Sequence, residues 1–155
     1  MIPPFTLCML SDHPHLVPAC AAWEAGEWGG PLEQALAEYA AARPDGLPLT
    51  VVAVDAAGAA AGMVSLWVSD CPLRPEITPW MASLYVAPAA RGHGLGSLLF
   101  ARAETEARRL GIDRLHLMTQ ESEDHYRALG WQTFDRIDGP GAMAGAALMR
   151  KDLAG

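Results

Sequence analysis

The sequence lacks any long apolar run, although 51% of its 155 residues are apolar. No uninterrupted apolar stretch approaches the roughly 20 residues that a membrane-spanning helix needs. Near the N-terminus, Pro3, Pro4 and Asp12 interrupt the chain and no basic residue precedes them, unlike in a secretory signal peptide. We therefore expect no membrane segment, no signal peptide and a cytoplasmic location.

Cysteine is scarce, because only Cys8, Cys20 and Cys71 are present and no Cys-x-x-Cys pair occurs. An odd number of scattered cysteines favours free buried thiols over disulfides or metal ligands. His13 and His15 are close in sequence but have no cysteine or carboxylate partner at a metal-binding spacing. The sequence therefore predicts no metal site.

Positively charged residues are also few, because the chain has 11 Lys and Arg and 18 Asp and Glu, for a net charge of −7. Nonspecific binding of nucleic acid needs a basic surface, so we expect no nucleic-acid partner. The acidic balance is compatible with a cationic amine as substrate.

What the sequence does contain is an organising stretch over residues 84–99, which predicts a strand, a turn, a glycine-rich loop and a helix. Pro88 cannot donate a hydrogen bond to a ladder, so the strand should end before it. From Leu95 an apolar stripe of helical period continues to Leu110, and Gly111 follows as the stop signal.

The glycines at 92, 94 and 96 lie where this helix begins. A helix N-terminus has unpaired N–H groups and a partial positive charge, and glycine lets an anion approach the backbone. With Arg91 as an added cation, the loop is predicted to bind phosphate. The Walker pattern is excluded because no lysine is near, and the dinucleotide pattern because Ser97 stands where its third glycine would be.

The spacing Arg-x-x-Gly-x-Gly at 91–96, preceded by Leu84-x-Val86, resembles the pyrophosphate loop of the GNAT superfamily of N-acetyltransferases. A second block begins at Tyr126 and resembles the Tyr-x-x-x-Gly-aromatic segment of the same superfamily, here completed by Gly130 and Trp131. It follows one more strand, as the family order requires. The two blocks lie within residues 80–136, about a third of the chain.

The rest of the chain is divided by its periodicity and its Gly and Pro signals into short elements. The predicted elements are a strand at 5–10, helices at 14–28 and 32–42, a hairpin of 49–54 with 62–68, a loop at 69–79, a strand at 114–118, a helix at 122–129 and a hairpin of 131–136 with 146–150. This order resembles the GNAT fold. We expect one α/β domain over residues 1–155, with a mixed, mostly antiparallel sheet of about six or seven strands flanked by helices.

The resemblance implies acetyl-coenzyme A (acetyl-CoA) as co-substrate, with its pyrophosphate on the amides of residues 92–97. It also implies that the pantetheine arm pairs beside residues 84–86, whose backbone amides would polarise the thioester carbonyl. The implied cofactor-binding residues are Leu84, Tyr85, Val86, Arg91, Gly92, His93, Gly94, Leu95, Gly96, Ser97 and Thr119.

Tyr126 corresponds to the tyrosine that protonates the departing thiolate in the family, although it could instead serve only in packing. The general base is less evident, because the strand positions that carry it in several relatives are Trp80 and Ala82 here. The remaining candidate bases, each of which could instead be a solvated surface carboxylate, are Glu24, Glu27 and Glu76.

Aromatic and imidazole side chains outside the two blocks are further candidates. Trp23, Trp28 and Trp80 could line an acceptor pocket or pack in the core. His93 is expected in an exposed loop near a phosphate, and His116 as a packed or hydrogen-bonded residue of a strand.

The leading hypothesis is an N-acetyltransferase that moves acetyl from acetyl-CoA to the primary amine of a small molecule or peptide. Direct attack in a ternary complex is favoured because no cysteine lies in either block. Relatives are often dimers, so the resemblance is compatible with a homodimer, although the sequence itself does not give the oligomeric state. One alternative is an acyl-CoA binding or sensor module without turnover, which the absent strand base favours. Another is a nucleotide-phosphate binder that uses the glycine loop.

Overall fold

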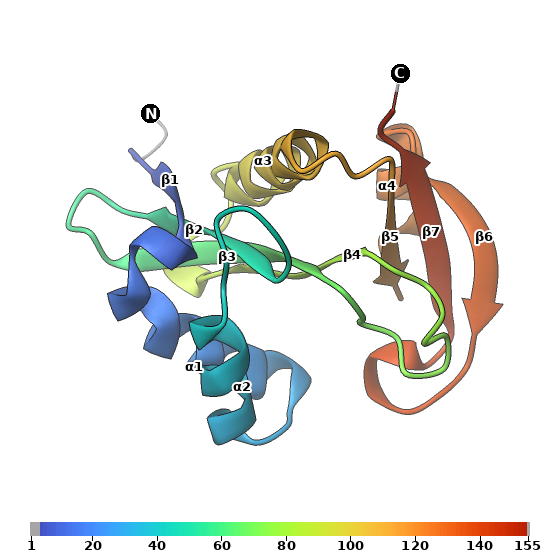
Figure 1. Cartoon of the computed structure of the whole chain (residues 1–155), viewed down its shortest axis with the longest axis horizontal. Helices are drawn as coiled ribbons and strands as arrows, with labels where there is room; N and C mark the ends of the chain where they lie inside the picture. Colours follow the sequence, from blue (N-terminus) through green and yellow to red (C-terminus); the bar gives the residue numbers. More distant parts are fainter. Residues whose placement is uncertain (1–3, 155) are drawn as a thin grey trace.

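The centre of the computed structural model, which describes residues 4–154, is one seven-stranded sheet in the order β1-β2-β3-β4-β5-β7-β6 (Figure 1). Its strands are β1 (Thr6–Met9), β2 (Leu49–Val54), β3 (Ala60–Trp67), β4 (Trp80–Val86), β5 (Arg114–Thr119), β6 (Gln132–Ile137) and β7 (Ala146–Asp152). Neighbouring strands are antiparallel except β4 and β5, which are parallel. The predicted α/β fold with a mixed, mostly antiparallel sheet is confirmed.

Helices cover both faces of this sheet, with α3 on one side and α1 and α2 on the other (Figure 1). They are α1 (Val17–Trp28), α2 (Leu32–Ala40), α3 (Leu95–Arg109) and α4 (Glu123–Ala128), with 3₁₀ turns η1 (Leu10–Asp12), η2 (Pro14–Leu16), η3 (Pro88–Ala90) and η4 (Gly141–Met143). The first α-helix begins three residues later than the predicted start at 14, because residues 14–16 form a 3₁₀ turn.

Strand β2 shows how the sequence separates the two layers. Successive side chains of a strand point to opposite faces of a sheet. Val51 and Ala53 pack in the cluster that includes α3, whereas Val52 between them packs in the cluster with α1 and α2. Burial on both faces explains why this strand is a continuous apolar run.

Helix α3 presents its predicted stripe to the sheet, with Leu95, Leu99, Ala103 and Ala107 buried. Each buried leucine stabilises the fold by roughly 1.5–3 kcal/mol relative to an exposed one. Gly111, at φ +76°, follows the helix end in a conformation that suits glycine. The apolar stripe therefore fixes the position of the helix N-terminus over the middle of the sheet.

A third cluster fastens the loop 69–79 to the other half of the sheet. Cys71, Trp80 and Leu148 are fully buried there, and the Trp80 Nε1–H donates to the carbonyl oxygen of Ile77 at 2.8 Å. The loop thus begins at the end of β3 and is held against β7 by its buried residues. No helix within residues 4–154 combines the length and the hydrophobicity that crossing a membrane requires.

Candidate active site

The sheet opens between its two parallel strands. Strands β4 and β5 pair at a single position, Trp80 with His116, and the His116 N–H donates to the Pro79 carbonyl at 3.2 Å. Further along, a cavity of about 340 Å³ lies between them, lined by residues 81–84 of β4 and by Leu117 and Met118 of β5. We call this the central cavity.

The strand that borders the central cavity contains a β-bulge. Met63 of β3 pairs with Tyr85 and Ser65 pairs with Ala82, so that two residues of β4 lie opposite one residue of β3. Ser83, in the bulge, has a φ of +58°, a strained value for a residue other than glycine. A bulge leaves its extra residue out of the ladder and redirects the neighbouring groups, and such features are frequent beside active sites.

The glycine loop after β4 leaves open space at the N-terminus of α3. Gly92 and Gly94 have φ values of +83° and +76°, and a Cβ added at either would meet no atom within 4 Å. The first backbone hydrogen bond of the helix runs from Leu98 N to Gly94 O at 3.2 Å. The amides of residues 95–97 therefore have no acceptor within the helix, and this cradle fits the pyrophosphate of acetyl-CoA.

Arg91 lies between this loop and the end of β4. Its Nε–H donates to the Val86 carbonyl oxygen at 2.9 Å, and its guanidinium carbon lies 5.7 Å from the centre of the Tyr85 ring. The side chain is exposed. It fastens the loop to the strand and leaves its terminal nitrogens at the molecular surface.

A second cavity of about 380 Å³ lies between α3 and α4, next to the glycine loop; we call it the cofactor-side cavity. It is lined by Leu84, Gly96, Ser97 and Phe100, with Tyr126 and Leu129 from the α4 segment. Three of these side chains also line the central cavity, namely those of Leu84, Phe100 and Tyr126. The two cavities are therefore adjacent parts of one groove.

Tyr126 lies at this junction. Its ring stacks on Phe100 with centroids 5.1 Å apart, which fixes the ring, and the residue lines both cavities. Burial raises the pKa of the Tyr126 phenol above its usual value of about 10. The phenol is therefore protonated at neutral pH, as a proton donor must be.

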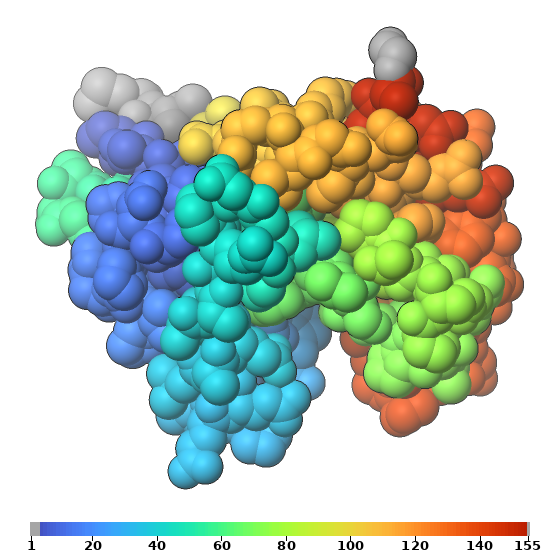
Figure 2. Space-filling view, in the orientation of Figure 1, coloured from blue at the N-terminus to red at the C-terminus, as the bar shows by residue number. Residues whose placement is uncertain are grey.

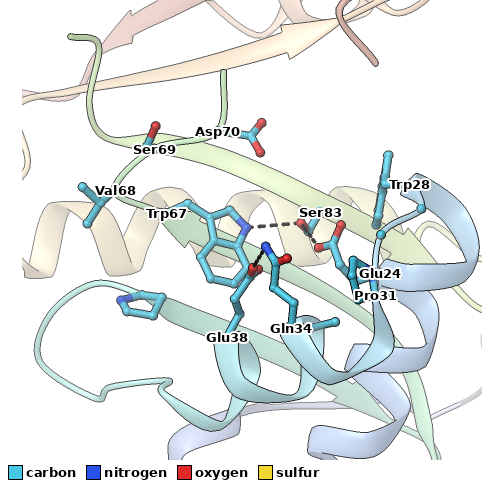
Figure 3. A pocket seen from close by; sticks show the side chains of 14 residues that line it. Glu24, Trp28, Pro31, Gln34, Glu38, Trp67, Val68, Ser69, Asp70 and Ser83 are labelled. Carbon is cyan, nitrogen blue, oxygen red and sulfur yellow. Dashed lines mark hydrogen bonds between the residues drawn. The ribbon is translucent and has the colours of Figure 1, made fainter. Parts of the chain in front are cut away.

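A third cavity, of about 420 Å³, opens on the opposite side of β4 between the α1–α2 segment and residues 67–70; we call it the acceptor-side cavity (Figure 3). In the space-filling view the surface is hollowed between the α2 region and the loop before β4 (Figure 2). The residues common to this cavity and the central one are Glu24, Trp28, Asp70 and Ser83.

Glu24 is held in place by two hydroxyl groups. Its Oε1 accepts a hydrogen bond from Ser83 Oγ at 2.6 Å (Figure 3). The same oxygen accepts a second hydrogen bond from Tyr39 Oη at 2.7 Å. Ser83 Oγ in turn accepts from Trp67 Nε1 at 3.2 Å. Three elements, α1, α2 and the bulge of β4, therefore fix the carboxylate at the border of the central and acceptor-side cavities.

Asp70 is the residue of this site that the sequence did not reveal. It follows the end of β3, is half-buried, and lines both the central and the acceptor-side cavities. Burial, and secondarily the negative charge of Glu24, raise the pKa of Asp70 to about 7. Its only sequence signal is an acid that follows a strand, which is common in loops.

The acceptor-side cavity is acidic. Glu24, Asp70 and Glu38 line it, and Glu38 accepts a hydrogen bond from Gln34 at 2.9 Å. Within the described chain, no Lys, Arg or His lines this cavity or the central one. The arrangement therefore suits a cation and disfavours a carboxylate or phosphate group.

Other candidates from the sequence lie elsewhere. Glu27 is exposed and lines none of the three cavities, and Glu76 is paired with Arg74 at 2.8 Å with 61% of its side chain exposed. Of the two alternatives for Trp80, the structure shows core packing, because its ring is fully buried in the third cluster. Trp28, by contrast, lines two of the cavities.

The candidate cofactor residues are similarly divided. Leu84, Gly96 and Ser97 line the cofactor-side cavity, whereas Gly92, His93 and Gly94 form the loop before α3. Leu95 is buried in the core below that loop, and Val86 packs against the same core.

Two more predicted residues have structural contacts. The centroid of the Tyr85 ring lies 5.1 Å from that of the Trp23 ring of α1. Thr119 Oγ1 accepts a hydrogen bond from the Ser122 N–H at 3.0 Å, which braces the turn before α4. His116 is confirmed as a hydrogen-bonded strand residue, with its Nδ1 2.9 Å from the Pro79 carbonyl oxygen. No cluster of three or more His, Cys, Asp or Glu side chains in the described residues could hold a metal ion.

Comparison with known proteins identifies the family and the fold. The model of the acetyltransferase (GNAT) family matches residues 17–131. An aminoglycoside 6'-N-acetyltransferase complexed with coenzyme A superposes with a TM-score of 0.73 at 14% identity, covering 97% of this chain and 98% of the other. An acyl-CoA N-acyltransferase from Pseudomonas aeruginosa has a TM-score of 0.67 at 22% identity, covering 96% and 99%. No curated protein sequence is significantly similar to the chain.

Proposed function

The chain belongs to the acetyltransferase (GNAT) family, and we propose that it acetylates the primary amine of a small cationic acceptor. The acetyl donor in this proposal is acetyl-CoA. The amine attacks the thioester carbonyl directly, with both substrates bound at once.

The observation that carries this proposal is the continuity of the three cavities. The cofactor-side cavity shares Leu84, Phe100 and Tyr126 with the central cavity, which shares Glu24 and Asp70 with the acceptor-side cavity. A phosphate cradle therefore lies at one end of the groove and an acidic cavity at the other. The opening of the sheet between β4 and β5 is where a thioester and an amine would meet.

In this proposal each group of residues along the groove has a separate role in the reaction. The amides at the N-terminus of α3 hold the pyrophosphate, and backbone N–H groups near the β4 bulge stabilise the oxyanion that develops on the thioester. The Tyr126 hydroxyl donates a proton to the sulfur of the leaving group. Its ring is held by Phe100 at 5.1 Å, so that little ordering is needed when substrates bind.

Direct attack is supported by where the thiols lie. Cys20 and Cys71 are fully buried in hydrophobic clusters, and burial raises the pKa of the Cys20 thiol to about 12. Within residues 4–154 no cysteine lines any of the three cavities. A covalent acetyl-cysteine is therefore not part of the proposal.

The class of acceptor is inferred from the charge of the acceptor-side cavity. Its carboxylates, with Trp28 and Trp67 as aromatic walls, favour an ammonium group on a short aliphatic or aromatic carrier. A carboxylate next to the reacting amine would approach like charges, which costs binding free energy. We therefore expect decarboxylated amines to be better acceptors than the corresponding amino acids.

The test is a thiol-release assay with acetyl-CoA and matched acceptor pairs, such as cadaverine with lysine and agmatine with arginine. The expected result is amine-dependent release of coenzyme A, with kcat/KM at least tenfold higher for the amine than for its amino acid. Peptide and aminoglycoside amines complete the panel. Equal values within each pair would contradict the proposed acceptor class.

Two other outcomes would contradict the enzymatic proposal itself. Tight binding of coenzyme A without release above background for any amine would indicate an acyl-CoA sensor. A larger increase in melting temperature with ATP or NAD than with coenzyme A would indicate a nucleotide-binding protein.

A further inference from the structure

An acceptor that binds as an ammonium ion must lose a proton before its nitrogen can attack. Two carboxylates, Glu24 and Asp70, lie at the border between the central and acceptor-side cavities. Their surroundings differ, and that difference separates their roles.

One oxygen of the Glu24 carboxylate accepts two hydrogen bonds. Hydroxyl groups of Tyr39 and Ser83 donate to the same oxygen, Oε1, at 2.7 and 2.6 Å. These two bonds fix the position of the carboxylate at the border of the two cavities. Glu24 is therefore suited to hold the ammonium group of the acceptor in place.

Asp70 has the opposite surroundings. It stands at the end of β3, and its carboxylate projects toward the cavity lined by Trp28 and Ser83 (Figure 3). Within the described chain no hydrogen bond or ion pair to its carboxylate occurs. Its oxygens are therefore available to a substrate.

We infer that Asp70 accepts the proton that the acceptor's ammonium group loses before attack, while Glu24 binds that group as a fixed anion. This inference rests on the proposed function. It assigns the base to a residue in the loop that follows β3 and not to strand β4.

The proton balance of the step is simple. One N–H proton of the ammonium passes to Asp70, and the neutral nitrogen forms a bond to the thioester carbonyl carbon. When the carbon–sulfur bond breaks, the sulfur takes a proton from Tyr126, and the phenol regains one from the former amine nitrogen. The proton on Asp70 leaves to solvent, so that one proton is released per acetyl group transferred.

The charged and titratable groups around Asp70 support this assignment. Glu24 faces it from α1, Glu38 from α2 across the acceptor-side cavity, and Tyr126 from α4 across the central cavity. No cation among the described residues lines either cavity. With a pKa of about 7, Asp70 is ionised enough to act at neutral pH and basic enough to take a proton.

The experiment measures kcat/KM between pH 5.5 and 8.5 for the best amine of the panel, chosen with an amine pKa above 9. Wild-type kcat/KM should rise to a plateau above about pH 7, where Asp70 is ionised. In Asp70→Asn only the neutral amine reacts, so kcat/KM should be about 10²–10⁴-fold lower at pH 7. It should then rise tenfold per pH unit without a plateau.

Two matched variants separate the roles. Glu24→Gln should raise KM and keep the plateau, and its inflection should move to lower pH because one negative charge beside Asp70 is gone. Asp70→Glu should retain a plateau at reduced kcat, which also covers the case in which Asp70→Asn does not fold. Glu33→Gln, an exposed acid of α2 that lines none of the cavities, is the control for net charge.

Failure of the inference and failure of the proposed function give different results. A plateau in Asp70→Asn like that of the wild type would overturn the inference, as would loss of the plateau in Glu24→Gln with Asp70 intact. Absence of amine-dependent release in the wild type would instead overturn the proposed function.

Discussion

Tyr126 lies at the junction of two cavities and combines an aromatic ring with a hydroxyl group. Its ring stacks on Phe100 with the centroids 5.1 Å apart, and burial raises the pKa of the phenol. Packing by the ring and the proposed proton donation by the hydroxyl reside in different parts of one side chain, which a single substitution can separate.

Tyr126→Phe keeps the ring and removes only the hydroxyl. We expect kcat to fall by about 10- to 100-fold, the lower end of general acid catalysis, because a thiolate leaves fairly easily. Coenzyme A affinity, measured by calorimetry, and the melting temperature should stay nearly constant. An unchanged kcat would show that water or another group protonates the sulfur.

At the scale of elements, the proposed binding of the cofactor depends on the junction of β4, the glycine loop and α3. The loop turns through two residues of positive φ, Gly92 and Gly94, with open space where side chains would be. Arg91 ties it to β4 through the Val86 carbonyl. The N-terminus of a fifteen-residue helix thereby points its free amides into the groove.

Gly94→Val should weaken coenzyme A binding at least tenfold, because its side chain would fill the space above the amides. The variant also carries a backbone cost of about 1–2 kcal/mol, since valine would take a left-handed conformation. Gly58→Val in the β2–β3 turn is the matched control: φ is +83° there and the Cβ would again meet open space.

Both variants should therefore lose similar free energy of unfolding in urea titrations, while only Gly94→Val loses cofactor affinity. Equal coenzyme A dissociation constants for the two folded variants would remove the phosphate cradle from the proposed site.

At the scale of the whole molecule, the sheet is both the core and the site. Strands β4 and β5 pair only at Trp80 and His116 and separate beyond that position. The groove occupies the gap between them, where a continuous sheet would have further backbone hydrogen bonds. Carboxylates at the border of this groove are partly removed from water. In the proposed function these carboxylates bind the substrate, at a cost to the stability of the fold.

Asp70→Asn should accordingly stabilise the folded protein at alkaline pH. The pKa of Asp70 is about 7 when folded and near 3.8 when unfolded, so wild-type stability falls as pH rises through this window. Asparagine does not ionise, so the variant does not lose folding stability as the pH rises through this window. We expect the variant to be more stable by roughly 2–4 kcal/mol at pH 8, at 1.36 kcal/mol per pKa unit less some solvent screening.

Urea unfolding of both proteins at pH 4, 6 and 8 measures this difference. It should be small at pH 4, where the aspartate is protonated in the folded state and only partly ionised in the unfolded state, and should grow to its full value above pH 7. A difference that does not change with pH would mean that Asp70 is not buried as a titrating group.

The sequence by itself determined the elements and the phosphate loop. The α3 stripe, the β2 run and the glycines at 92, 94 and 96 are local patterns, because helix period, strand alternation and a helix N-terminus depend on neighbours in the chain. Tyr126 was found for the same reason, since it belongs to a contiguous block with Gly130 and Trp131. The fold followed from the order of these elements.

Only the tertiary structure decided which carboxylates and aromatic rings meet in the groove. Glu24 and Glu27 lie one turn apart on α1, yet only Glu24 is reached by the hydroxyls of Tyr39 and Ser83. Trp28 lines the groove and Trp80 is buried in the core, although both are tryptophans at element ends. The pKa of Asp70 is raised by burial and by the charge of Glu24, to which it is close in space and distant in sequence. Desolvation and charge act through space, so no local pattern of residues records them.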